Sequence, residues 1–516
     1  MKRWPLLLPF LFAIAPVLTL FASNSGQVAF SETTLPMATT FALTLILLPA
    51  CRALFRSTLR AAVALSIFWW VMFAYGHVAT IIGKFPIAGH NPANAKFLLP
   101  LTGVALAAGT VALRRARREP VMLARVLLIV VTAMLAASLI TIVRMGTSRP
   151  PFTAAAVRPD EPLRAGTVIR KPDIYYIIFD RFGSSATLKQ RYGVDLTPML
   201  EHLRSRGFYV AGDSRANYLV TAQSLASSLN MMHLLPLSDA VGRQSSDWLP
   251  VFELLGDYRL RGFLADQGYR YVHVGPAWTP TARNRFAHEN VAFATVPEFT
   301  MMLVSTTAIY PVLQRVGLGD PNLEKYRRVQ QQLDVLSQLP AREPEPLFVF
   351  AHFLVPHGPF VFNRDGSYRV PEVAHVHDEA ANFVEQVGYL DGRIRALVDS
   401  LLAGYPRENS PVIVIQGDEG PYPTRTQPHA FQWETATNEE FSEKMRVLNA
   451  IHAPGCEAQF YPSMTPVNTF RIVLNHYFGT QLAMLPDRSY SYRDQKRLYD
   501  FFEVTDRIDA VPAGDD

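Results

Sequence analysis

Long uninterrupted apolar runs dominate the first third of the 516-residue chain, whereas short apolar runs alternate with helical patterns in the rest. Five of the long runs have a length that crosses a bilayer, which takes about 20 apolar residues per helix. They lie at about Pro5–Ala22, Leu35–Leu54, Ala62–Ile82, Phe97–Leu113 and Val126–Val143. The pattern therefore predicts a membrane domain of five transmembrane helices over residues 1–144.

Charged residues between these runs indicate how the helices cross the membrane. The loops at 52–60 and 114–118 are rich in arginine, whereas the other two loops hold only two lysines. Because basic loops stay in the cytoplasm, we expect a multi-pass protein of a bacterial-type inner membrane with a cytoplasmic N-terminus. An odd number of crossings then makes the C-terminal domain periplasmic or extracellular. A cleaved signal peptide is the alternative for the first run, but that run continues past Pro16.

The charge balance of the two parts of the chain argues against nucleic acid as a partner. Residues 1–144 hold 13 Lys and Arg but only two acids, whereas the remainder holds 36 basic and 42 acidic residues. A nucleic-acid-binding protein places its basic charge on a folded domain. Here the excess lies between membrane-spanning runs, where it sets topology.

Composition also divides the rest of the chain. Residues 145–171 are rich in Pro, Ala, Arg and Thr and read as a linker, which leaves 172–516 as a soluble domain. The only two cysteines, Cys51 and Cys456, fall on opposite sides of this division, so no disulfide is expected. Residues 238–338 carry no recognisable motif. A stretch within them, TMMLVSTTAIYPVLQ (300–314), is either plain structure or an insertion near the membrane.

Five short β-branched runs in the soluble domain alternate with helical patterns. They are DIYYIIF (173–179), FYVAG (208–212), YRYVHVG (269–275), LFVFAHF (347–353) and PVIVIQG (411–417). Continuous apolar strands separated by helices are typical of a parallel sheet covered on both faces. The fold class predicted is therefore a five-helix transmembrane region followed by an α/β domain with a mostly parallel central sheet. In such sheets ligands bind outside the carboxyl ends of the strands.

Polar side chains follow three of these runs. They are Asp180 and Arg181, then His352 and His357, then Asp418 and Glu419. Each has a plainer explanation taken alone: a turn-forming acid, a core histidine or a solvated carboxylate. However, all three strands should end at one edge of the sheet, and adjacent carboxylates repel each other unless a cation or proton intervenes. A divalent metal ion is the simplest positive neighbour for Asp418 and Glu419.

Five sequence islands resemble one protein superfamily. In order they are PDIYYIIFD, TAQS, HFLVPHGPF, QGDEGP and TPVNTFRIVLN. Together they resemble the alkaline phosphatase/sulfatase superfamily, and with five preceding spans they look like the membrane-anchored lipoteichoic acid synthases and lipid A phosphoethanolamine transferases. The resemblance implies an alkaline-phosphatase-like, sulfatase-like domain.

The resemblance also implies roles for individual residues. Thr221, in a T-x-x-S pattern that resembles the transferases, would be the nucleophile, with Ser224 as the next candidate. The absence of cysteine from 216–231 excludes a formylglycine sulfatase of the usual kind. The implied metal ligands are Asp180, Thr221, Asp418 and Glu419, and the implied substrate-binding residues are His352, His357 and Arg181.

One departure from the family pattern bears on the metal. Transferases commonly have Asp-His where this chain has Asp418-Glu419, so the implied ligand set is all oxygen. Such a set favours one divalent cation, Mn²⁺ or Mg²⁺ over Zn²⁺ or Ca²⁺. His429 would restore a nitrogen ligand if its loop folds back. Alternatively, Glu419 marks a site that has lost its activity.

The function these features favour is a metal-dependent, membrane-anchored phospho-group transferase with a covalent threonine intermediate. Its substrate would be a membrane phospholipid headgroup or a cell-envelope glycan. Two alternatives stay open: a phosphate or sulfate ester hydrolase on the same fold, and a non-catalytic scaffold with a relic site. A transporter is disfavoured because the five spans contain few charged residues.

Overall fold

The chain folds into two compact units, each with its own core. The structure, a computed structural model, describes residues 4–85, 91–149, 152–159, 161–293, 296–339, 345–370, 378–421 and 432–512. The first unit, here called the membrane unit, combines residues 1–149 with 295–320. The second, called the outer domain, combines residues 150–294 with 321–516. The chain therefore passes between the two units three times.

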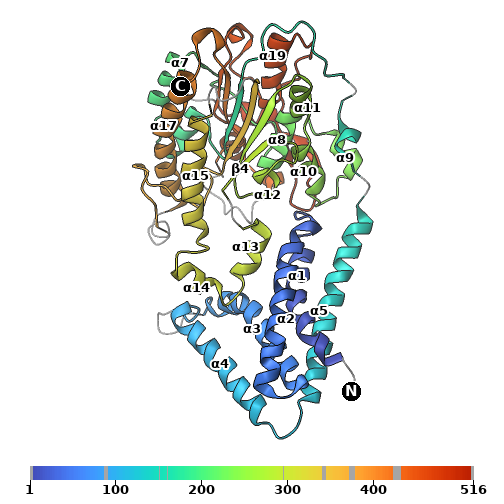
Figure 1. The fold of residues 1–516 in the computed structure, drawn as a ribbon. Helices are drawn as coiled ribbons and strands as arrows, with labels where there is room; N and C mark the ends of the chain where they lie inside the picture. The colour runs from blue at the N-terminus through green and yellow to red at the C-terminus, as the bar shows by residue number, and fades with distance from the viewer. Residues whose placement is uncertain are drawn as a thin grey trace. The chain divides into compact units, whose positions relative to one another are not determined.

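The membrane unit contains five helices that are long and apolar enough to cross a membrane, which confirms the five predicted spans. They are α1 (Leu8–Asn24), α2 (Thr34–Phe55), α3 (Thr58–Ile82), α4 (Ala95–Arg115) and α5 (Val121–Ser148). The unit also contains the short 3₁₀ helices η1 (Trp4–Leu7) and η2 (Phe30–Thr33). Two further helices come from residues far along the chain, α13 (Glu298–Ser305) and α14 (Tyr310–Arg315) (Figure 1).

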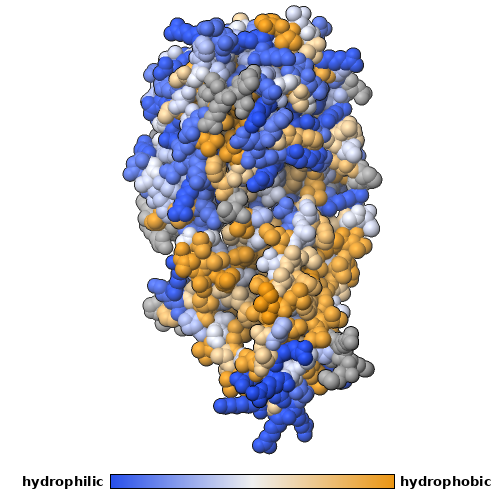
Figure 2. Space-filling model, in the orientation of Figure 1, coloured by the Kyte–Doolittle hydropathy of each residue, from blue (hydrophilic) through white to orange (hydrophobic). Residues whose placement is uncertain are grey.

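Apolar side chains cover the outside of the membrane unit as well as its interior. Figure 2 shows a hydrophobic surface over these helices with a hydrophilic cluster at one end. Large apolar residues on α2, α4 and α5 are exposed, among them Ile46, Leu101 and Ile129. A helix that is hydrophobic all round is typical of a membrane span, because lipid rather than water surrounds it.

The outer domain is built on a seven-stranded sheet in the order β2-β7-β6-β1-β5-β3-β4. The strands are β1 (Ile174–Phe179), β2 (Tyr209–Val210), β3 (Arg270–Gly275), β4 (Glu289–Ala292), β5 (Leu347–Phe353), β6 (Val412–Gly417) and β7 (Asn449–His452). The five strands β6, β1, β5, β3 and β4 are parallel, whereas β7 is antiparallel to both of its neighbours, β6 and the edge strand β2. A two-stranded sheet, β8 (Tyr490–Tyr492) with β9 (Phe501–Glu503), lies apart.

Helices cover both faces of this sheet, as the continuous apolar strands predict (Figure 1). All six residues of β1 are buried, and they alternate between two cores. Tyr176 belongs to the core shared with α8, α10, α11 and α19, whereas Ile177 belongs to the core shared with α7, α15 and α17. The fold class predicted from the sequence is confirmed: five apolar helices precede an α/β domain with a mostly parallel sheet.

The remaining helices connect the strands. They are α6 (Ser185–Tyr192), α7 (Thr197–Ser205), α8 (Thr221–Asn230), α9 (Pro236–Val241), α10 (Leu249–Gly256), α11 (Arg259–Asp266), α12 (Thr279–Ala282), α15 (Pro321–Ser337), α17 (Glu379–Ala403), α18 (Asn438–Met445), α19 (Pro466–Phe478) and α20 (Thr505–Asp509). Four of the five predicted strands correspond to long strands of the sheet. The fifth, FYVAG, forms only the two-residue edge strand β2, and β4 and β7 were not predicted from the sequence.

Candidate active site at the carboxyl edge of the sheet

Three neighbouring parallel strands end at the same edge of the sheet and bring three side chains together. β1 lies between β6 and β5, and its last residue is level with the last residue of each neighbour. Asp180 follows β1, Asp418 follows β6, and His352 is the last but one residue of β5. One possible ligand atom from each side chain lies within 4.8 Å of the other two, and all three residues are buried. The sequence predicted the meeting of the two carboxylates but gave His352 a substrate-binding role.

Each of these side chains keeps one buried polar atom without a hydrogen-bond partner in the described parts of the chain. These atoms are Oδ1 of Asp180, Oδ2 of Asp418 and Nε2 of His352. A buried polar atom left unpaired costs about 1–3 kcal/mol, so a ligand that pairs all three would be strongly favoured. Two carboxylate oxygens and one imidazole nitrogen are a donor set that divalent cations accept. The three residues therefore fit a divalent metal ion.

The histidine of this group is held in an orientation that suits a ligand. His352 Nδ1 lies 2.8 Å from the Thr281 hydroxyl oxygen. Burial, with a contribution from His273, lowers the pKa of His352 to about 3, so the ring is neutral. With its proton on Nδ1 and donated to Thr281, the ring leaves the Nε2 lone pair free to bind a cation.

Electrostatics at this edge favour a positive ligand. Burial, followed by the charges of Asp418 and Glu419, raises the pKa of Asp180 well above its ordinary value. Burial, followed by the charge of Glu419, raises the pKa of Asp418 to about 7, although a hydrogen bond from the Thr221 side chain acts in the opposite direction. Both shifts mean that the ionised carboxylates are disfavoured until a cation offsets their mutual repulsion.

Glu419 has positive side-chain neighbours, although the sequence suggested a metal ion there. Its Oε1 atom lies 2.7 Å from Lys444 Nζ and 3.1 Å from Arg181 Nε. Lys444 is fully buried, and α18 delivers it from a helix that begins with a capping box at Thr437 and Glu440. The Oε2 atom of Glu419 is buried without a hydrogen-bond partner among the described residues. One oxygen of this carboxylate is thus committed to two cations.

Arg181 joins the two acidic positions through a strained backbone. Its φ of 67° lies in the left-handed region, which is uncommon for residues other than glycine. In this conformation its amide donates to Asp418 Oδ1 at 3.1 Å, while its guanidinium reaches Glu419. Strained residues held by their surroundings cluster at functional sites, so the conformation supports a role for Arg181 in arranging the carboxylates.

The two candidate nucleophiles lie on one helix. Thr221 is the first residue of α8, and its side chain hydrogen-bonds to the carboxylate of Asp418. Ser224 lies one turn further on, and its hydroxyl oxygen is buried with no partner in the described residues. The structure therefore brings Thr221 together with the acidic group, as the resemblance implies.

The structure describes His357 and Cys456, but not His429. The His357 amide donates to the Asp180 carbonyl at 3.1 Å, and burial, then Arg181 and Lys325, lowers its side-chain pKa well below the ordinary value. His429 lies outside the described residues. Cys456 is a buried free thiol whose pKa burial, with Glu457, raises to about 12, which suits a packed residue rather than a nucleophile.

Two lysines of this site were missed by sequence reasoning. Besides Lys444, Lys325 on α15 is buried and donates to the carbonyls of His357 and Pro359 at 2.6 and 2.9 Å. Burial lowers the pKa of Lys325 to about 7, against the opposing effect of the Asp180 charge. A signal for it exists, because Lys325 occupies a position of the apolar stripe that continues at Val329 and Leu333 of the same helix.

The glycines of QGDEGP allow close backbone approach around the carboxylates. A Cβ atom on Gly417 would lie 2.2 Å from the Phe182 carbonyl oxygen, and one on Gly420 would lie 2.3 Å from the Glu443 carbonyl oxygen. The Gly420 amide also donates to the Lys444 carbonyl at 2.7 Å. This contact holds the chain after Glu419 against the end of α18, so that Lys444 can reach the carboxylate.

We expect Gly420→Ala to lower the free energy of unfolding by about 2 kcal/mol, because the methyl group must displace backbone rather than a flexible side chain. Thermal unfolding of the full-length protein in detergent measures the effect. Gly392→Ala is the matched control, since a Cβ at that α17 position meets nothing within 4 Å. Equal melting temperatures for the two variants would contradict the close approach.

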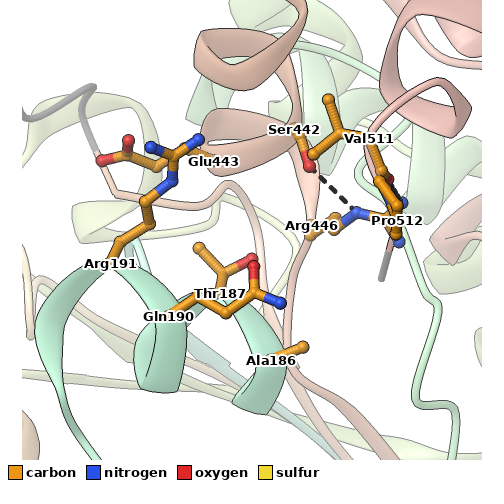
Figure 3. Close-up of a pocket in the computed structure, with 9 residues that line it drawn as sticks. All are labelled: Ala186, Thr187, Gln190, Arg191, Ser442, Glu443, Arg446, Val511 and Pro512. Carbon is orange, nitrogen blue, oxygen red and sulfur yellow. Dashed lines mark hydrogen bonds between the residues drawn. The ribbon is translucent and has the colours of Figure 1, made fainter. Parts of the chain in front are cut away.

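A small pocket lies between α6, the end of α18 and the C-terminal segment. Its volume is about 10 Å³, and Figure 3 shows its lining from α6, α18 and the C-terminal segment. The lining residues are Ala186, Thr187, Gln190, Arg191, Ser442, Glu443, Arg446, Val511 and Pro512. Tyr192 donates to Glu443 at 2.7 Å, and Arg446 Nε donates to Ser442 at 3.1 Å. A space of this size holds about one water molecule, so the pocket is too small for a substrate.

Fold and site together define a membrane-anchored α/β protein with a buried acidic centre at the carboxyl edge of its sheet. No protein-family model matches the sequence, and no curated protein is significantly similar to it. Solved structures with a similar chain path do exist. They include the C-terminal periplasmic domain of EcEptC from Escherichia coli, with 13% identity, a TM-score of 0.41, and coverage of 66% of this chain and 96% of that one.

Two other similar solved structures are of a synthase and a transferase. The lipoteichoic acid synthase LtaP from Listeria monocytogenes has 14% identity and a TM-score of 0.37, covering 62% of this chain and 77% of that one. The integral membrane protein lipooligosaccharide phosphoethanolamine transferase A from Neisseria meningitidis has 11% identity and a TM-score of 0.37, covering 96% and 98%. These are the kinds of protein that the sequence islands resemble. At such identities and TM-scores, however, the similarity assigns no activity to this chain.

Proposed function

We propose that this protein is a metal-dependent, membrane-anchored phospho-group transferase that acts on lipid headgroups or cell-envelope glycans through a covalent intermediate on Thr221. One observation carries the proposal. Thr221 begins a helix and hydrogen-bonds to Asp418, whose carboxylate forms a buried group with Asp180 and His352. Each of those three keeps an unpaired ligand atom. A hydroxyl beside such a group has the surroundings that activate a nucleophile.

In the first step the Thr221 hydroxyl oxygen attacks the phosphorus of a phospholipid headgroup in line. Its proton passes to Asp418, which already accepts its hydrogen bond, and the N-terminal end of α8 stabilises the developing negative charge. The bond from phosphorus to the diacylglycerol oxygen breaks. That oxygen leaves with a proton supplied by Lys325, a buried lysine near Asp180 whose pKa burial lowers to about 7.

A divalent cation held by Asp180, Asp418 and His352 would supply Lewis-acid stabilisation of the phosphate oxygens and a lowered pKa for the nearby hydroxyl. Arg181 contributes a fixed positive charge for the phosphoryl oxygens, because its two contacts with Asp418 and Glu419 hold it at the site. In the second step an acceptor hydroxyl attacks phosphorus, its proton passes to the Lys325 amine that gave one up in the first step, and the bond to Thr221 breaks. Asp418 then returns the proton to the threonine.

The membrane unit favours a lipid or envelope substrate. Five helices long and apolar enough to span a bilayer precede the outer domain. An enzyme that is integral to a membrane meets phospholipid headgroups and membrane-linked glycans at high local concentration, whereas a soluble ester gains nothing from the anchor. A cytoplasmic N-terminus, set by the arginine-rich loops, would place the outer domain in the periplasm or outside the cell.

We expect the tryptic peptide 216–243, which contains Thr221, to gain the mass of a phospho-headgroup when the full-length protein is incubated with phospholipid and a divalent cation and then quenched. Thr221→Ala should abolish the adduct, because the Thr221 hydroxyl is the one that hydrogen-bonds to Asp418. Ser224→Ala is the matched control on the same helix and should retain it. Mass spectrometry of the digested protein gives the result and identifies the transferred group.

The outcomes of this experiment separate the proposal from its alternatives. An adduct that passes to an added glycan establishes a transferase. An adduct that decays only to free phosphate in the presence of acceptors indicates the hydrolase. If neither an adduct nor metal binding is found with any phospholipid headgroup, the site is a relic and the protein acts as a scaffold.

A further inference from the structure

The segment between β4 and α15 belongs to the membrane unit, although its sequence lies inside the outer domain. Residues 296–320, here called the docking insert, form α13 and α14 (Figure 1). Strand β4 before it and helix α15 after it belong to the outer domain. The chain therefore leaves that domain and returns to it in order to place about two dozen residues on the membrane helices.

The docking insert is joined to α3 by a reciprocal pair of backbone hydrogen bonds. The Gly76 amide donates to the Thr306 carbonyl at 2.8 Å, and the Ala308 amide donates to the Met72 carbonyl at 3.0 Å. Met72 and Gly76 are one helical turn apart, so these are the two groups that an α-helix would pair with each other. Backbone polar groups within a bilayer need protein partners, and the insert adds a partner for each of these two groups.

The residue of α3 at this contact is Gly76, which has no side chain to block it. A Cβ atom on Gly76 would lie 2.8 Å from the Cα atom of Thr306 and 2.9 Å from its carbonyl oxygen. Only glycine allows the two backbones to approach this closely, as small residues do in the interfaces of membrane helices. The main chain of the docking insert thus packs directly against the main chain of α3 at Gly76.

One side of the docking insert is buried in the membrane unit. Phe299 and Leu303 are 2% and 5% exposed and belong to the hydrophobic core that α1, α3 and α5 share. Ala308 is buried with Tyr75 and Leu98, from the last turns of α3 and the first turn of α4. The insert therefore packs as part of the helix bundle.

Other side chains of the docking insert are apolar and exposed. They are Met302, Ile309, Val312, Val316 and Leu318, of which Val316 and Leu318 are 65% and 60% exposed. From Phe299 to Leu318 the sequence contains a single charged residue, Arg315. Such a group of exposed apolar side chains marks an interaction surface, because water disfavours it.

The position of the insert on the bundle indicates what covers this surface. It contacts η2, α1 and the second half of α3, and it clusters with the first turn of α4. The arginine-rich loops 52–60 and 114–118 join the opposite ends of these helices. The exposed apolar side chains of the insert thus continue the lipid-facing surface of the helices at the face away from the arginines.

We propose that the docking insert is a membrane-embedded element whose exposed apolar side chains contact lipid acyl chains in the leaflet opposite the arginine-rich loops. The occupant is the bilayer itself, because the surface is continuous with that of the five candidate spans and is anchored to α3 by its backbone. The outer domain is then attached to the membrane unit through the insert as well as through the segment after α5. This inference does not depend on the chemistry of the Asp180 site.

Photolabelling of the unaltered full-length protein tests the lipid contact. The protein is reconstituted in vesicles of phosphatidylethanolamine and phosphatidylglycerol that carry a diazirine on an acyl chain, irradiated and digested with trypsin. We expect lipid adducts on peptide 316–325, VGLGDPNLEK, at Val316 or Leu318. Peptide 396–407, ALVDSLLAGYPR from α17 and its end, is the control and should carry none. Labelled spans with an unlabelled insert, or cross-links from the insert to a second copy, would overturn the proposal.

Gly76→Ala should release the docking insert from α3. In the same vesicles we expect the amides around Ala308 to exchange with deuterium about tenfold faster in this variant, because the added methyl group separates the paired backbones. Lipid adducts on peptide 316–325 should change in yield at the same time. Gly103→Ala, on α4 with nothing within 4 Å of the new Cβ, is the matched control and should leave both measurements unchanged. Equal exchange in the two glycine variants would exclude the backbone docking.

Discussion

Lys444→Met is expected to lower the free energy of unfolding of the outer domain by about 3–5 kcal/mol, the range measured when one partner of a buried ion pair is removed. Lys444 is fully buried, and its ammonium lies 2.7 Å from Glu419 Oε1. Methionine fills a similar volume but carries no charge. Among the described residues the variant therefore leaves Glu419 with Arg181 as its ion-pair partner, next to the carboxylates of Asp180 and Asp418, whose repulsion Lys444 no longer offsets.

Denaturant unfolding of the full-length protein in detergent, followed through the tryptophans of the outer domain, measures this difference. Lys189→Met is the matched control, because Lys189 is exposed on α6 and its replacement should change stability by no more than about 0.5 kcal/mol. The double variant Lys444→Met with Glu419→Gln should recover much of the loss, since it removes both charges of the pair. A Lys444→Met variant as stable as Lys189→Met would show that the pair contributes nothing.

This pair also shows where sequence reasoning stopped. The run of apolar residues before QGDEGP predicted a buried strand, and the adjacent carboxylates predicted a cation beside them. Both statements depend on local pattern and on Coulomb repulsion, so they hold in the structure. The identity of the cation at Glu419 depends on Lys444 of α18, which lies 25 residues later in the sequence, and no local period relates the two residues.

The location of the docking insert could not be predicted from the sequence for a similar reason. Its apolar composition at 300–314 was visible in the sequence, and an insertion near the membrane was one of two readings. Its location depends on a main-chain contact between Thr306 and Gly76, residues 230 positions apart. Neither residue is unusual alone: a glycine in an apolar helix and a threonine in a short loop are both common. Only the fold shows that Gly76 leaves room for the backbone of Thr306.

The group around Asp180 was predicted more completely, because parallel strands align their carboxyl ends. Asp180 and Asp418 were expected from strand ends and Thr221 from the resemblance, and all three meet. The role of His352 was harder to assign, since a histidine near the end of a buried strand faces either core or ligand. Its Nδ1 atom contacts Thr281, which comes from the short helix α12. The other ring nitrogen, Nε2, is therefore the one available to a ligand.

His352→Gln is expected to weaken binding of a divalent cation by about 100-fold or more, since loss of even an outer-shell partner of a metal ligand costs 10–100-fold. His352 offers an uncommitted Nε2 atom beside the unpaired oxygens of Asp180 and Asp418. Glutamine preserves the size and polarity of the side chain but lacks the imidazole nitrogen. The loss should be larger for Zn²⁺ than for Mn²⁺, because imidazole suits zinc better than it suits manganese.

Glu419→Gln is the decisive comparison, because the all-oxygen set predicted from the sequence included Glu419 and excluded His352. We expect this variant to change metal affinity by less than about tenfold, since Oε1 of Glu419 is already held by Lys444 and Arg181. Titration of metal-free protein with Zn²⁺ and Mn²⁺ against a competing chelator measures both affinities without any substrate. His452→Gln, a buried histidine of β7 whose Nδ1 contacts the Pro411 carbonyl, controls for the loss of a buried imidazole. If Glu419→Gln removes the metal and His352→Gln does not, the ligands are the four oxygens, and the ion pair with Lys444 must open when the cation binds.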